Sequence, residues 1–141
     1  MGFDIQKEAV ESTRRRLQLH EISESVYELH HASHSTISRI DLAPVKAAMF
    51  NLGYLPGGDK SVITSAEDSL AALQAVLDSL ASGGVVTVMC YPGHEGGDTE
   101  AKEILNFCQM LDRQVWQVQR VDELDQDQTR PFLIGIFRRG N

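Results

Sequence analysis

The spacing of apolar residues along the chain predicts an alternation of helices and strands. Apolar side chains at helical spacing indicate amphipathic helices, and short continuous apolar runs indicate strands. The expected helices cover residues 5–19, a short weak segment around 37–42, a segment from 64 to 82, and residues 101–111. The expected strands cover residues 26–29, 46–51, 85–90, 115–121 and 132–137.

The helix expected from residue 64 carries boundary signals at both ends. Thr64 and Glu67 have the spacing of a capping box, in which a hydroxyl and a carboxylate satisfy free amides at a helix start. Gly83-Gly84 is expected to stop the helix. The following run, residues 85–90, is apolar without alternation, which is typical of a strand covered on both faces.

The last two expected strands are joined by DELDQDQTRP, a polar connection too short for a helix, so they should pair antiparallel. The earlier strands alternate with helices, which favours parallel pairing. The pattern therefore predicts one α/β domain over residues 1–141, with a mostly parallel, Rossmann-like sheet between helical layers and an antiparallel hairpin at the C-terminal end.

Charge changes this picture little. The formal net charge of −7 argues against general coating of nucleic acid, because phosphate contacts need clustered cations. Local basic patches stay compatible with RNA contact, although a solvated helix face is the simpler interpretation of the arginine triplet. The candidates are Arg14, Arg15, Arg16, Lys60, Arg130, Arg138 and Arg139.

Cysteine usage and hydropathy point to the cytoplasm. Cys90 and Cys108 lie in apolar patterns without CxxC spacing, as expected for buried free thiols in a reducing compartment. No apolar run has the length of a membrane span, and the first residues lack the hydrophobic segment of a signal peptide. We therefore expect a cytoplasmic protein without a membrane partner.

Two loops follow expected strands and carry the candidate chemistry. FNLGYLPGGDK occupies residues 50–60, and YPGHEGG occupies residues 91–97. In open α/β sheets, ligands bind at the carboxyl ends of the strands. We expect the two loops to form one active-site rim. The Gly-rich turn in the second loop either presents amides to phosphate or only turns the chain.

These two loops, with the helix and the GG-strand between them, resemble the YtqB/MnmM-type family of bacterial S-adenosylmethionine (SAM)-dependent methyltransferases. That family has been labelled as rRNA methylases and is linked to methylation of the aminomethyl group on wobble thiouridine in tRNA. The resemblance extends from Gly2 to Arg138. It implies a class I methyltransferase fold, SAM as cofactor, and tRNA or another RNA as substrate.

The resemblance also implies cofactor contacts. Asp4 would bind the ribose hydroxyls, Ile5 would lie against the adenine, and Ser33 and His34 would lie near it. The full expected set is Asp4, Ile5, Ser33, His34, Asn51 and Leu52. For Asp4 a purely structural alternative stays open, because Asp is a good N-cap residue.

Asn51 is the expected catalytic residue. Many amino-group methyltransferases carry Asn or Asp at this strand end, where its oxygen accepts a hydrogen bond from the reacting amine. Such acceptors orient the nitrogen lone pair for in-line displacement. A turn-forming Asn is the alternative. The nearby Tyr54 can stack on a base. The residues expected to bind the substrate are Tyr54, Pro56, Gly57, Tyr91, Pro92, Gly93 and His94.

His94 is the second catalytic candidate, because methyl transfer to an amine needs the neutral amine and a histidine can take its proton near neutral pH. Asp59 is the other candidate base, and an ordinary loop histidine is the alternative for His94. His30, His31 and His34 are not expected to bind a metal, since a strand would point the first two to opposite faces.

The resemblance implies that the family's first strand–helix unit, with its Gly-rich SAM loop, is missing from this sequence. We therefore expect an N-terminally truncated domain in which the strands ending at Asp4 and Asn51 leave a gap, pair directly, or receive a strand from another chain. The functional alternative is a non-catalytic remnant that binds RNA or dimerises. Under either alternative, a second copy of the chain or a partner chain is a candidate to complete the sheet.

Overall fold

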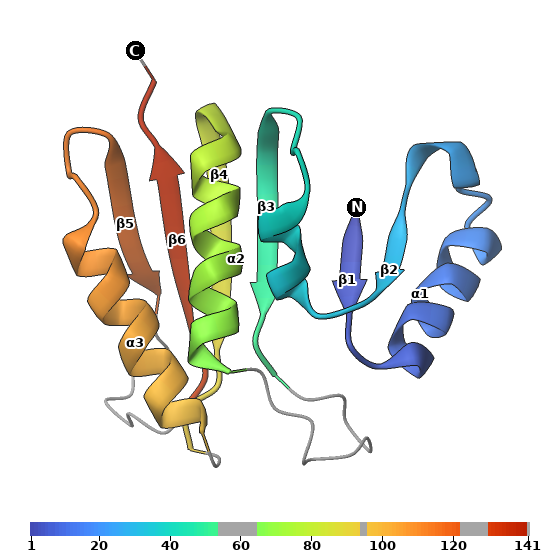
Figure 1. Ribbon diagram of the computed structural model, residues 1–141, viewed down its shortest axis with the longest axis horizontal. Helices are drawn as coiled ribbons and strands as arrows, with labels where there is room; N and C mark the ends of the chain where they lie inside the picture. The colour runs from blue at the N-terminus through green and yellow to red at the C-terminus, as the bar shows by residue number, and fades with distance from the viewer. Residues whose placement is uncertain (54–64, 94–95, 122–129, 141) are drawn as a thin grey trace.

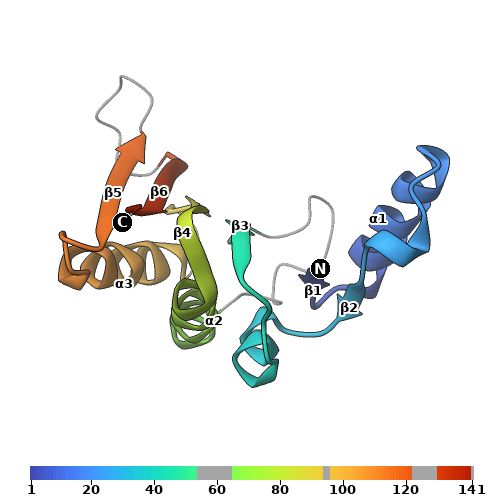
Figure 2. The same ribbon diagram turned by 90° about the horizontal axis from the view of Figure 1, so that it is seen from above.

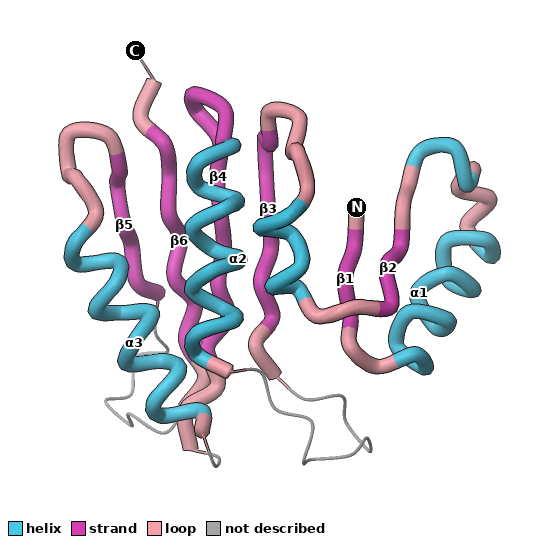
Figure 3. Tube along the Cα trace, viewed as in Figure 1, coloured by secondary structure: helices cyan, strands magenta, loops and turns pink. Residues whose placement is uncertain are grey.

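Two separate sheets lie side by side in the computed structural model, which describes residues 1–53, 65–93, 96–121 and 130–140. The smaller sheet pairs β1 (Gly2–Asp4) with β2 (Leu29–His31) in parallel. The larger sheet has the order β3-β4-β6-β5 (Figure 1; Figure 3 shows the strands in magenta). Its strands are β3 (Val45–Asn51), β4 (Leu80–Cys90), β5 (Trp116–Val121) and β6 (Phe132–Arg138).

Strand directions within the larger sheet follow the connections between its strands. β3 pairs with β4 in parallel through the helical crossover between them. β6 is antiparallel to both of its neighbours, β4 and β5. The predicted C-terminal hairpin is therefore confirmed. The two sheets meet at β1 and β3, which lie next to each other and point the same way without pairing (Figure 1).

The helices are α1 (Lys7–Leu19), α2 (Ala66–Ser79) and α3 (Gly97–Met110), with short 3-10 segments η1 (Glu24–Val26) and η2 (His34–Arg39). Seen from above, α2, α3 and η2 all lie on one side of the larger sheet, whereas α1 lies on the opposite side beside β1 and β2 (Figure 2). None of the helices in the described parts of the chain is both long enough and apolar enough to cross a membrane.

The hydrophobic core lies between the larger sheet and α2 and α3. Alternate residues of β4 and β6, including Val86, Val88, Ile134 and Ile136, are at most 1% exposed. The other face of the sheet is more open, and Met49 on β3 is 87% exposed. In the described residues α2, α3 and η2 cover one face of the larger sheet, and α1 lies on the opposite side beside the smaller sheet.

The first predicted strand is displaced along the chain. Residues 24–26 form η1 rather than a strand, because Ser23 Oγ accepts a hydrogen bond from Ser25 N at 3.3 Å and starts a tight turn. The strand follows at Leu29–His31. The short helix expected around 37–42 is the 3-10 segment η2, which ends at Arg39.

Both predicted boundaries of α2 need correction. Its N-cap is Ser65, whose Oγ accepts from Asp68 N at 3.1 Å, so the helix does not begin with the expected capping box of Thr64 and Glu67. Thr64 itself lies outside the described residues. The helix ends at Ser79, and Gly83, with φ of 74°, lies inside the long strand β4 rather than at the helix end.

Cys90 and Cys108 are 1% and 7% exposed, as predicted for buried free thiols. Burial raises the pKa of Cys90 to about 12 and that of Cys108 to about 11. An exposed thiol ionises near a pKa of ~8.5. The unfolded chain therefore loses these protons at a lower pH than the folded chain does.

We predict that the free energy of unfolding falls as pH rises from ~8.5 toward the folded pKa values, because deprotonation then favours the unfolded state. The double variant Cys90→Ala/Cys108→Ala should show a shallower fall over the same range, since titrations of other groups are common to both proteins. Urea unfolding at several pH values measures the difference. Equal slopes would show that the thiols do not contribute.

Candidate active-site groove

A groove of about 840 Å³ separates β1 from β3. Phe3 lines it from β1, and Phe50, Asn51 and Leu52 line it at the end of β3. His34, the first residue of η2, also lines it. The groove therefore includes the carboxyl end of β3, where an open α/β sheet binds ligands.

Asp4 is the last residue of β1, and its side chain organises the turn into α1. Its Oδ1 accepts a hydrogen bond from Gln6 N at 2.8 Å. The N-cap of α1 is Gln6, so Asp4 stabilises the turn before the helix and is not its N-cap. Because Asp4 is exposed and this bond uses one carboxylate oxygen, the other oxygen retains acceptor capacity for a ligand.

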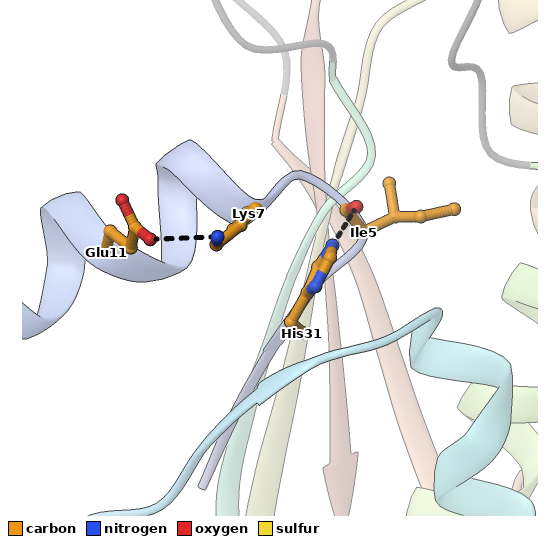
Figure 4. A network of polar contacts seen from close by, with 4 residues as sticks. All are labelled: Ile5, Lys7, Glu11 and His31. Carbon is orange, nitrogen blue, oxygen red and sulfur yellow. Dashed lines mark hydrogen bonds and ion pairs between the residues drawn. The ribbon is translucent and has the colours of Figure 1, made fainter.

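His31 holds the same turn from the neighbouring strand (Figure 4). Its Nε2 lies 3.0 Å from the carbonyl oxygen of Ile5, and since a carbonyl only accepts, Nε2 carries the proton. The Ile5 side chain is 52% exposed and points away from α1, where Lys7 and Glu11 form an ion pair at 3.7 Å (Figure 4). The backbone that carries Asp4 and Ile5 is thus fixed by two side chains.

The neighbouring His30 has a different environment. Its ring stacks on Phe3 with centroids 4.6 Å apart and planes 12° apart, whereas His31 contacts the turn after β1. In the parts of the chain that the structure describes, no three His, Cys, Asp or Glu side chains are grouped to hold a metal ion.

Ser33 and His34 begin η2 next to the groove. Ser33 is the N-cap of η2, and its Oγ accepts from Ser35 N at 3.2 Å. The hydroxyl of Ser33 therefore has a structural role, whatever else it contacts. The ring of His34 meets Phe50 edge to face, with centroids 6.3 Å apart.

Two polar residues that the sequence did not single out lie behind His34. Nε2 of His34 is 3.2 Å from Ser69 Oγ, and Ser69 Oγ donates to Glu100 Oε1 at 2.7 Å. Burial lowers the pKa of His34, while the nearby Asp68 and Glu100 carboxylates oppose that shift. Ser69 and Glu100 occupy core-facing positions of their helices, so a polar residue on the apolar stripe was the available signal.

Asn51 ends β3 with an exposed side chain, and Leu52 behind it is only 4% exposed. Leu52 N donates to Met89 O at 3.1 Å, so the link between β3 and β4 continues one residue past β3. Asn51 is opposite Met89 in the register, which places the first residues after β3 beside those after β4.

The described part of the second loop lies against the first. A Cβ on Gly53 would be 3.1 Å from the Tyr91 ring, so the absence of a side chain permits this approach. Gly93 has φ of 89° and donates from its amide to Asp98 Oδ1 at 3.0 Å. Pro92, between Tyr91 and Gly93, is half-buried. The predicted residues Tyr54, Pro56, Gly57 and His94 lie outside the described residues.

The groove thus brings together Asn51, Leu52 and His34, and places the loop of Tyr91 beside them. Asp4, the last residue of β1, and Ile5, in the turn that follows, do not line the groove itself. The strands of this chain run mostly parallel and end in an antiparallel hairpin, with polar loops at the strand ends. This arrangement is the class I methyltransferase fold.

The chain belongs to the family described as "Putative rRNA methylase", whose sequence profile matches residues 1–136. A "putative rRNA-methylase" from Clostridium thermocellum is 36% identical, and the match covers 97% of this chain and 73% of that one, with a TM-score of 0.89. A "putative methyltransferase" from Streptococcus mutans in complex with SAH is 38% identical over 96% of this chain and 73% of that one, with a TM-score of 0.85.

A curated relative from Arabidopsis thaliana is named "tRNA (mnm(5)s(2)U34)-methyltransferase, chloroplastic". It is 35% identical over 144 residues, which cover 99% of this chain and 52% of the relative. The chain therefore spans about half the length of this relative.

We predict that Gly53→Ala displaces the Tyr91 ring, because the added methyl group would lie 3.1 Å from it. Amide NMR shifts should change around Tyr91 and Gly93, with little change in β5 or β6. Gly140→Ala is the matched control, since the nearest atom to its added Cβ is Ser82 Oγ at 3.8 Å. Unchanged Tyr91 resonances in Gly53→Ala would contradict the contact.

Proposed function

We propose that this chain carries the SAM-dependent methyltransferase activity of its family and methylates RNA. The observation that carries the proposal is the position of Asn51, at the carboxyl end of β3 on a groove that His34 also lines. The SAH bound to the Streptococcus mutans relative supports the choice of cofactor.

The residues present fit an adenosine-containing cofactor. The Asp4 carboxylate has acceptor capacity for ribose hydroxyls, the exposed Ile5 offers an apolar surface to a purine, and His34 supplies a ring nitrogen. Asn51, Leu52 and His34 line the groove, and Asp4 and Ile5 directly follow Phe3, which also lines it. When bound, SAM supplies a methyl group activated by its sulfonium charge.

Asn51 would act on the methyl acceptor. Its side-chain oxygen accepts a hydrogen bond from the amine and turns the nitrogen lone pair toward the methyl carbon. The bound cofactor would supply its methyl group to this lone pair as its C–S bond breaks, and the nitrogen would then release a proton. The amine must be neutral to react, and removal from water lowers the pKa of an amine. His94 and Asp59, the candidate bases, lie outside the described residues.

We propose the aminomethyl group of a tRNA wobble uridine as the methyl acceptor. The name of the Arabidopsis relative and the NLGYLPGGDK and YPGHEGG loops support this choice. Tyr91, Pro92 and Gly93 beside Gly53 would contact the nucleotide, together with Tyr54, Pro56, Gly57 and His94. An aromatic ring at this rim can stack on a base that has left the anticodon stack.

Asn51→Ala should lower the turnover number by about tenfold or more, because it removes an acceptor that orients the amine in the transition state. The assay measures transfer of labelled methyl groups from SAM to tRNA that carries an aminomethyl wobble uridine. SAH binding should change less than turnover, since Asp4, Ile5 and His34 remain.

The matched control is Asn106→Ala, an exposed asparagine on α3 that does not line the groove. It should retain wild-type turnover and SAH binding. Near-normal turnover in Asn51→Ala would overturn the proposed role of Asn51. Absence of methyl transfer by the wild-type chain would instead favour the non-catalytic alternative, an RNA-binding or dimerising domain.

The edges of the two sheets favour a second proposal, that another chain pairs with this one at the groove. β1 and β3 each have one strand neighbour among the described residues, and their facing edges border the groove. Unpaired strand edges with apolar side chains are templates for pairing. We propose either a homodimer or a partner chain there.

For the homodimer, light scattering after gel filtration should give twice the chain mass at high protein concentration. Met49→Lys should shift the protein toward monomer, because Met49 on β3 is 87% exposed and a charge at a sheet edge opposes pairing. Met110→Lys is the control, with a 78% exposed methionine at the end of α3. A monomer at all concentrations would exclude the homodimer.

A further inference from the structure

A chain of three hydrogen-bonded polar side chains, two of them buried, joins the groove to the helical layer. His34 lies on η2, Ser69 on α2 and Glu100 on α3, and two hydrogen bonds connect them in that order. Ser69 is 1% exposed and Glu100 is 4% exposed. Burying a carboxylate is costly unless it is hydrogen-bonded, so an arrangement of this kind calls for a structural or functional reason.

The direction of the two bonds follows from the chemistry of the groups. Ser69 Oγ donates its single hydroxyl proton to Glu100 Oε1 at 2.7 Å. Ser69 Oγ then has only lone pairs to offer to His34 Nε2 at 3.2 Å. Nε2 must therefore carry a proton and donate it to Ser69.

The state of the other ring nitrogen follows. Burial lowers the pKa of His34, which favours the neutral ring. A neutral imidazole with its proton on Nε2 has a free lone pair on Nδ1 and accepts a hydrogen bond there. Among the described residues Nδ1 has no hydrogen-bond partner, and His34 lines the groove.

We propose that Ser69 and Glu100 are positioning residues, which hold His34 in the Nε2–H tautomer so that Nδ1 accepts a hydrogen bond from an amine of a groove-bound ligand. The identity of that ligand rests on the proposed function: it is the purine ring of the cofactor, whose exocyclic amine is a donor. The positioning residues themselves do not touch the ligand. They act through His34.

The tautomer is measured without any ligand. In the wild-type chain, ¹⁵N NMR of the histidine rings at neutral pH should give His34 a protonated Nε2 and an unprotonated Nδ1. Glu100→Gln should weaken this bias, because a side-chain amide can donate to Ser69 and free the hydroxyl proton for His34. Asp68→Asn is the matched control, since it removes a nearby charge that is not hydrogen-bonded to His34. A protonated Nδ1 in the wild-type chain would overturn the proposal.

Binding then tests the ligand. SAH should bind the wild-type chain more tightly than its 6-oxo analogue, S-inosylhomocysteine, which has a carbonyl in place of the amine. Ser69→Ala and Glu100→Gln should reduce this preference by roughly fivefold, the value of one ordinary hydrogen bond, whereas Asp68→Asn should keep it. An unchanged preference in both variants, with folding intact by circular dichroism, would overturn the role assigned to Ser69 and Glu100.

The two experiments separate this inference from the proposed function. If the wild-type chain binds neither SAH nor its analogue, the ligand assignment fails with the proposed function. If the ring also lacks the Nε2–H tautomer, the positioning role of Ser69 and Glu100 fails as well. If both ligands bind equally and the tautomer is present, the positioning role stands and the contact with the amine is excluded.

Discussion

The parallel pairing of β3 with β4 is the interaction on which the rest of the structure depends. It aligns Asn51 with Met89 and continues through the hydrogen bond between Leu52 N and Met89 O at 3.1 Å. Because parallel strands end at the same edge of a sheet, this pairing brings the loops after both strands together. β4 also packs against both α2 and α3, so the core and the site share this strand.

Side-chain spacing was sufficient to predict most of the fold. The alternation of elements, the antiparallel final hairpin and the buried cysteines follow from local periodicity and from the length of the connections. The strand expected at residues 26–29 lies instead at Leu29–His31, because the turn that begins at Ser23 includes Val26. The cap at Ser65 was missed because Thr64 and Glu67 satisfied the same local rule one residue earlier.

The site was predicted less completely, for a physical reason. A strand-end loop can be recognised from a few adjacent residues such as Asn51 and Gly53, and these do lie on the groove or beside it. The contact between Ser69 and Glu100 joins residues on two different helices. Its existence depends on how those helices pack, and periodicity predicts only that each residue faces inward. The open face of the larger sheet is likewise a property of packing that no local pattern contains.

The bond between His31 and the Ile5 carbonyl has a consequence for how the protein responds to acid. Nε2 donates in this bond, and it does so whether the ring is neutral or charged. Protonation of the His31 ring therefore leaves this bond in place. A ring that must accept a hydrogen bond through Nδ1 behaves in the opposite way, since a proton there converts an acceptor into a donor. At low pH, His31 would therefore still hold the turn after β1. His34 would change from a hydrogen-bond acceptor to a donor at Nδ1, and the groove would then bind a different set of ligands.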